Sequence, residues 1–106
     1  MRFWRGKAFH LVLLLSSFLL SSCTEIDDLK KAAEQGDADA QFNLGYMYYK
    51  GNGVVEDDVM AYLWWNLAAA QGFESAKKNK GILSERMTRE QIAEAQKLSR
   101  EWLAKR

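Results

Sequence analysis

The apolar and polar positions of this chain divide it into one apolar run followed by a series of amphipathic segments. Phe9 to Leu20 is almost entirely apolar, and basic residues precede it. From residue 26 onward, apolar side chains recur at the three- and four-residue spacing of an α-helix, and no stretch alternates as a β-strand does. After the apolar run, the pattern predicts an all-α protein with about five helices.

Capping residues and glycines set the expected ends of these helices. Asp and Thr side chains accept amide hydrogens at a helix start, and glycine favours the left-handed position after a helix end. Glycines in the KGNGV segment, 50–54, predict a tight connection. The expected helices are 26–35, one from Asp37 to about Lys50, one from Asp57 to just before Gly72, one over 74–84, and one that begins with a Thr88–Gln91 capping box.

The third and last of these helices predict how the elements pack. Val59 to Ala70 has no polar residue except Asn66, and a helix without a polar face is buried on several sides. The last helix instead has one apolar face and a charged remainder, as the end unit of a stack needs for solubility. Its expected apolar face consists of Ile92, Ala95, Leu98, Trp102 and Leu103.

Two segments of the chain repeat each other. AAEQGDADAQ begins at Ala32 and AAAQGFESAK begins at Ala68, which is an offset of 36 residues. The same offset pairs Gly45 with Gly81. A period of this length is typical of stacked helical units, so we expect a short α/α solenoid of antiparallel helix pairs.

The segment AQFNLGYMYYKGNGVVEDDVMAYLWWNLAAAQG, residues 40–72, resembles one complete Sel-one-like repeat, a relative of the tetratricopeptide repeat. The resemblance implies a repeat domain over 26–106, made of a partial unit (26–36), a complete unit (37–72) and a divergent C-terminal capping unit (73–106). It also implies an adaptor that binds other proteins. The residues that carry it are Ala40, Leu44, Gly45, Tyr48, Gly51, Gly53, Val54, Asp57, Ala61, Trp64, Ala68, Ala69 and Gly72.

The first 22 residues have the order of a secretory signal peptide: a basic end, an apolar middle and small residues before the cut. The apolar run is shorter than the roughly 20 residues of a spanning helix. Leu20-Ser21-Ser22-Cys23 resembles the lipobox of bacterial lipoproteins, which implies cleavage before Cys23, lipidation of its thiol and a short linker over 23–25. Thr24 resembles the residue found in lipoproteins of the outer membrane that face the periplasm.

The residues after the signal offer little for catalysis. His10 is the only histidine and Cys23 the only cysteine, so serine–histidine, cysteine–histidine and zinc sites are not expected in the mature chain. Paired acids at 27–28 and 57–58 lie at predicted helix starts, where they favour the helix dipole. We predict no enzyme activity and no cofactor. The nearly neutral charge predicts no nucleic-acid partner.

Two groups of residues are candidates for binding a partner. Phe42, Tyr46 and Tyr49 share one side of the second helix, where they either pack against a neighbouring helix or face a partner protein. Residues 24–73 carry nine acids and three basic residues, whereas 74–106 carry nine basic residues and five acids. In the basic half, Lys77, Lys78 and Lys80 either meet an acidic protein or anionic headgroups, or form a solvated face.

These features favour a membrane-anchored lipoprotein whose helical repeats mediate protein–protein interaction in the bacterial cell envelope. The alternatives are a cell-wall-associated ligand binder or enzyme accessory protein, and a fragment that completes its solenoid by pairing with another chain. The sequence does not fix the oligomeric state.

Overall fold

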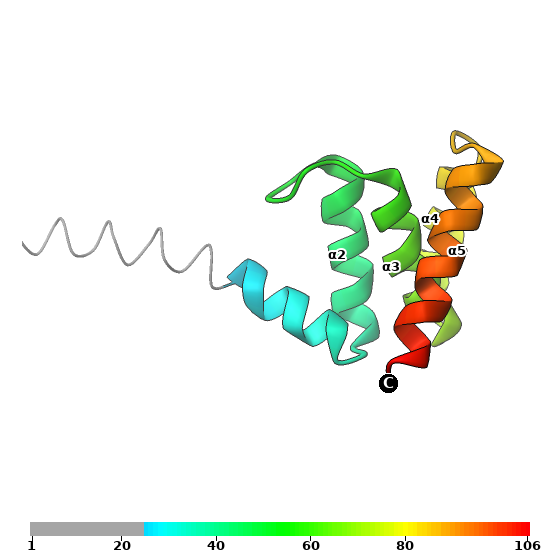
Figure 1. Ribbon diagram of the computed structural model, residues 1–106. Helices are drawn as coiled ribbons and strands as arrows, with labels where there is room; N and C mark the ends of the chain where they lie inside the picture. Colours follow the sequence, from blue (N-terminus) through cyan, green and yellow to red (C-terminus); the bar gives the residue numbers. More distant parts are fainter. Residues whose placement is uncertain (1–24) are drawn as a thin grey trace, which may run out of the picture.

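A computed structural model describes residues 25–106, and these residues form helices joined by short connections (Figure 1). Residues 25–34 form the first helix, and α2 (Ala38–Lys50), α3 (Asp58–Ala70), α4 (Glu74–Ser84) and α5 (Arg89–Ala104) follow. Within residues 25–106 no strand is present. The predicted all-α fold, a short helical solenoid, is confirmed.

The predicted capping residues begin three of the helices. The Asp37 side chain accepts from the Ala40 amide at 3.0 Å, and Asp57 accepts from the Met60 amide at 3.1 Å. At the start of α5, Thr88 and Gln91 bond to each other's backbone amides in a complete capping box. Each bond satisfies an amide that has no partner inside its helix.

The connection between α2 and α3 reverses the chain direction (Figure 1). Gly51 and Gly53 have φ angles of 68° and 78°, a left-handed conformation that side chains with a Cβ rarely adopt. Beyond them, the Asp57 amide donates to the Tyr48 carbonyl at 3.0 Å. The turn thus returns Asp57 to the end of α2, where it caps α3 and sets α3 antiparallel to α2.

Helix α3 is the centre of the fold, because α2, α4 and α5 all pack against it. Figure 1 shows it between α2 on one side and α5 on the other. Most of its side chains are buried, and Ala61 and Ala68 are completely so. Small side chains let the neighbouring helices approach closely. The prediction that this helix is covered on several sides is confirmed.

The buried side chains form two clusters, and successive tryptophans of α3 belong to different ones. Trp65 joins Ala76 and Leu83 of α4 and Ala95 of α5. Trp64 joins a second cluster, which contains Ala33, Ala40, Leu44, Leu63 and Leu67. Adjacent residues of a helix point in different directions, so Trp65 packs among α4, α5 and α2, whereas Trp64 packs among α2, α5 and the helix over 25–34.

Helix α5 covers α3 with the expected face except at its end. Ala95 is fully buried, and Ile92, Leu98 and Trp102 pack against the two clusters. Leu103 is instead 53% exposed and lines an open hollow. Across residues 25–106, no helix has both the length and the apolar character needed to cross a bilayer.

Candidate functional site

The aromatic stripe of α2 is partly packed and partly exposed. The Phe42 ring stacks on Phe73 with centroids 4.8 Å apart, and Tyr49 lies 5.6 Å from the Trp65 ring. Tyr46 lies between them in sequence and is 46% exposed. Phe42 and Tyr49 therefore pack against other parts of the fold, which is one of the two alternatives expected from the sequence. Tyr46 instead presents its ring to solvent.

The aromatic stripe of α2 packs against Trp65 of α3. Its indole N–H donates to the Phe42 carbonyl at 3.0 Å. Gly45 makes the approach possible, because a Cβ at that position would lie 2.5 Å from Trp65 Cδ1. The missing side chain of Gly45 and the hydrogen bond together fix the indole under α2.

Two cations flank the exposed tyrosine face. Lys50 Nζ lies 5.8 Å from the Tyr46 ring centroid and 5.6 Å from that of Tyr49, and the Arg86 guanidinium lies 4.6 Å from the Tyr49 centroid. Arg86 also forms two hydrogen bonds to the Asp58 carboxylate, at 2.6 and 3.1 Å. These bonds raise the pKa of Arg86 above its ordinary value.

A small cavity of about 140 Å³ opens between α2 and α4 at this face. Tyr46 and Tyr49 line it from α2, Trp65 from α3, and Asn79, Ile82 and Leu83 from α4. Ile82 is 55% exposed, and Tyr46 and Ile82 are two of the few large apolar side chains on the surface of residues 25–106. We call Tyr46, Tyr49, Lys50 and Ile82 the α2–α4 face.

The candidate lysines do not form one patch. Lys77 pairs with Glu74 at 3.3 Å, and Lys80 donates to Asn66 at 3.1 Å while lying over the Tyr62 ring. Lys78 is exposed and lies one turn before Ile82 on α4. Of the lysines proposed from the sequence, Lys78 is therefore the one on the same side of α4 as Ile82, which belongs to the α2–α4 face.

Lys50 and Ile82 were not among the residues singled out from the sequence, although the repeat contains the signal for both. At the 36-residue offset, Tyr46 corresponds to Ile82 and Lys50 corresponds to Arg86. Each unit thus has an exposed aromatic or apolar residue, on α2 or α4, and a cation four residues later, which is Lys50 at the end of α2 and Arg86 in the turn after α4. Comparing the two units position by position would have found this pair.

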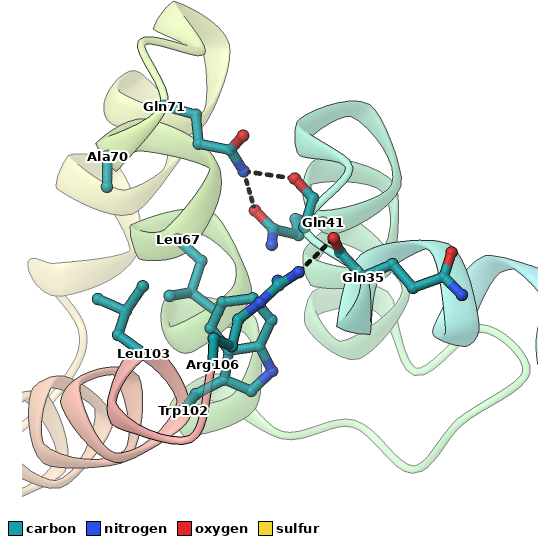
Figure 2. A pocket seen from close by; sticks show the side chains of 9 residues that line it. Gln35, Gln41, Leu67, Ala70, Gln71, Trp102, Leu103 and Arg106 are labelled. Carbon is teal, nitrogen blue, oxygen red and sulfur yellow. Dashed lines mark hydrogen bonds between the residues drawn. The ribbon is translucent and has the colours of Figure 1, made fainter.

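A second, larger hollow lies at the other end of the helices (Figure 2). Amide side chains organise one wall of it. Gln71 donates to the Gln41 side-chain oxygen at 2.9 Å and to the Gly36 carbonyl at 2.8 Å, and the fully buried Gln41 donates to the Ala33 carbonyl at 3.1 Å. This network joins the helix over 25–34 to α2 and α3. Sequence reasoning did not identify it, because amide side chains carry no distinctive motif.

Among residues 25–106, no three His, Cys, Asp or Glu side chains are placed to hold a metal ion. Cys23, the expected lipidation site, lies outside the described residues.

Comparison with known proteins identifies the repeat. The sequence model of the Sel1 repeat matches residues 29–37 and 38–73. Chitin synthase regulatory factor 3 of Schizosaccharomyces pombe is 48% identical over 48 residues, which is 45% of this chain and 5% of that protein. The secretory immunoglobulin A-binding protein EsiB of Escherichia coli is 36% identical over 67 residues, which is 58% of this chain and 14% of that protein.

The chain therefore spans only a small part of the length of these relatives, and the similarity concerns the repeat. The longer matched segment contains α2, the glycine turn and α3. Sel1 repeats are generally protein–protein interaction modules. The resemblance to Sel-one-like repeats is confirmed over residues 29–73, the part of the chain that matches the Sel1 repeat.

Proposed function

We propose that this chain is an exported lipoprotein, anchored to a bacterial membrane through Cys23, whose Sel1 repeat binds another protein of the cell envelope. The support for the anchor is the sequence itself: a signal-like segment over 1–22 followed by a lipobox-like Leu20-Ser21-Ser22-Cys23. Two or more acyl chains hold a protein stably on a bilayer, because each buried CH₂ contributes about 0.8 kcal/mol. Thr24 favours the outer membrane and a periplasmic orientation.

The observation that carries the binding role is the exposure of Tyr46 and Ile82 beside a formed cavity. The large apolar side chains of α3, such as Trp65 and Leu67, are almost completely buried, whereas Tyr46 of α2 and Ile82 of α4 are about half exposed. Tyr46 and Ile82 remain outside the core. Aromatic residues are enriched in protein interfaces, where an apolar ring and a hydroxyl both find partners.

The relatives also favour a protein ligand. By its name, EsiB binds secretory immunoglobulin A, which is itself a protein. The aligned part of EsiB is a small share of its length, so the support concerns the class of ligand and not its identity.

Crosslinking in intact cells tests this proposal. The tagged full chain is crosslinked, purified under denaturing conditions and compared with Cys23→Ala purified in the same way. We expect an envelope protein that is enriched with the wild-type chain and lost or reduced when the anchor is removed. Failure to enrich any protein above an unrelated tagged lipoprotein would contradict the proposal.

The same experiment distinguishes the alternative of a cell-wall ligand binder or enzyme accessory protein. A wall ligand would appear as muropeptides attached to the purified chain, and an accessory role would appear as a wall enzyme among the crosslinked proteins. Recovery of muropeptides without an enriched protein would favour the wall-ligand reading over the proposed one.

A further inference from the structure

The hollow in Figure 2 has the size and lining of a ligand site. Its volume is about 500 Å³, within the range of roughly 300–1,000 Å³ typical of small-molecule sites. Leu67 of α3 and Trp102 and Leu103 of α5 supply apolar walls, and Gln41 and Gln71 supply amides. Leu103 is the exposed member of the α5 face, so its apolar surface is available to a ligand.

The amide network holds one wall of this hollow in place without a ligand. Gln41 is completely buried, and both its oxygen and its nitrogen are hydrogen-bonded. The Gln71 nitrogen has two acceptors, whereas no donor to the Gln71 side-chain oxygen is found among residues 25–106. The buried and fully bonded Gln41 fixes this wall, and the exposed Gln71 keeps its side-chain oxygen available as an acceptor.

Arg106 is the charged side chain of the lining, and it has no carboxylate partner within residues 25–106. Its guanidinium lies 4.4 Å from the Trp102 ring centroid and donates to the Gln35 carbonyl. Gly36 leaves room for it, since a Cβ there would lie 2.8 Å from an Arg106 nitrogen. Figure 2 shows the side chain reaching from α5 toward Gln35. Arg86, by contrast, is paired with Asp58.

We infer that this hollow binds the C-terminal end of a peptide, with Arg106 as the partner of the free carboxylate. A guanidinium has five N–H donors in a planar fork and binds carboxylates with two of them. The apolar walls suit an apolar last side chain, and the Gln71 oxygen can accept a peptide N–H. This site is separate from the α2–α4 face.

Titration of the full chain in detergent micelles with defined peptides tests the inference. The probes are N-acetyl-leucyl-leucine, the same dipeptide with a C-terminal amide, N-acetyl-leucine, acetate and inorganic phosphate. The readout is the indole N–H signals in a nitrogen-15 spectrum, because Trp102 lines this hollow and Trp65 lines the other cavity. We expect the acid dipeptide to shift the Trp102 signal, and to bind at least tenfold more tightly than its amide and than acetate.

Variants of Arg106, which follows α5, and of Arg100 on α5 assign the effect to the Arg106 guanidinium. Arg106→Gln should weaken the acid dipeptide at least tenfold, and Arg106→Lys should retain part of the affinity. Arg100→Gln changes another exposed arginine of α5 and should leave binding unchanged. Equal binding of acid and amide, a response of Trp65 equal to that of Trp102, tighter binding of phosphate, or no binding of the acid dipeptide would each overturn the inference.

Discussion

Gly45 and Gly81 occupy the same position in successive units, yet they meet different surroundings. A Cβ on Gly45 would collide with the Trp65 ring at 2.5 Å, whereas a Cβ on Gly81 would meet nothing within 4 Å. Trp65 cannot move away easily, because its N–H is bonded to the Phe42 carbonyl. The glycine of α2 is therefore required for packing, and the glycine of α4 is not.

This difference predicts opposite effects of the same substitution. Gly45→Ala should lower the free energy of unfolding by about 1–3 kcal/mol, the usual result of overpacking a core. Gly81→Ala should leave stability unchanged or raise it by up to about 1 kcal/mol, because alanine is the better helix former. Urea unfolding of both variants measures the difference. Equal stability of the two would show that Trp65 is not held under α2.

Trp64 provides a second prediction at this scale. Its side chain is 6% exposed and lies in the cluster that joins α2, α3 and the helix over 25–34. Trp64→Ala should reduce the free energy of unfolding by about 3–5 kcal/mol, since it removes a large buried ring and leaves a cavity. Loss of most far-UV circular dichroism near room temperature would agree with this magnitude, and a melting temperature near that of the unchanged chain would contradict it.

The individual site residues were only partly predictable from the sequence. The spacing of Phe42, Tyr46 and Tyr49 placed them on one side of a helix, and it could not show that Phe73 would cover Phe42. That contact depends on where α4 begins relative to α2. The separate roles of Lys77, Lys78 and Lys80 likewise depend on neighbours that adjacent sequence does not specify.

At the scale of the helix, local chemistry determines the ends. Asp57 has an extended conformation, accepts from the Met60 amide and closes the turn onto Tyr48. Asp57→Ala should lower the free energy of unfolding by about 0.5–2 kcal/mol, and Asp57→Asn should recover most of that loss, because asparagine also caps helices well. Thermal unfolding monitored by circular dichroism measures this. An Asn variant as unstable as the Ala variant would show that the side-chain cap is unimportant.

The helices themselves were predictable because their signals are short in range. Caps at Asp37, Asp57 and Thr88 act within three residues, and the glycines after α2 act within one turn. The end of α5 was less predictable. Leu103 fits the apolar face by spacing, but it is exposed and lines the open hollow, which depends on the distant residues that form the other walls.

At the scale of the whole molecule, the proposed lipid anchor would hold the helical repeat at a membrane, with the α2–α4 face as its proposed binding surface. The repeat shown by the comparisons explains the stacked helices, and the α2–α4 face lies on the helices that recur with the repeat. The 36-residue offset between the units relates Tyr46 to Ile82. A partner that spans α2 and α4 would therefore meet an apolar side chain on each.

Removal of the proposed lipid site tests the tether. Cys23→Ala should move the protein from the membrane fraction to the soluble fraction or leave the signal segment uncleaved, because no other thiol is present to be acylated. Cell fractionation followed by mass measurement of the chain checks both outcomes. A cleaved Cys23→Ala product that stays with the membrane would contradict lipid anchoring.

Photo-crosslinking from single positions tests the central claim, that the α2–α4 face of a non-catalytic repeat binds another protein. A photoreactive phenylalanine analogue replaces Tyr46 or Ile82 in the full chain in cells, and Glu94 on the exposed side of α5 serves as the matched control. We predict the same protein adduct from positions 46 and 82 and none from position 94. Adducts from position 94 alone, or equal adducts from all three positions, would contradict the account.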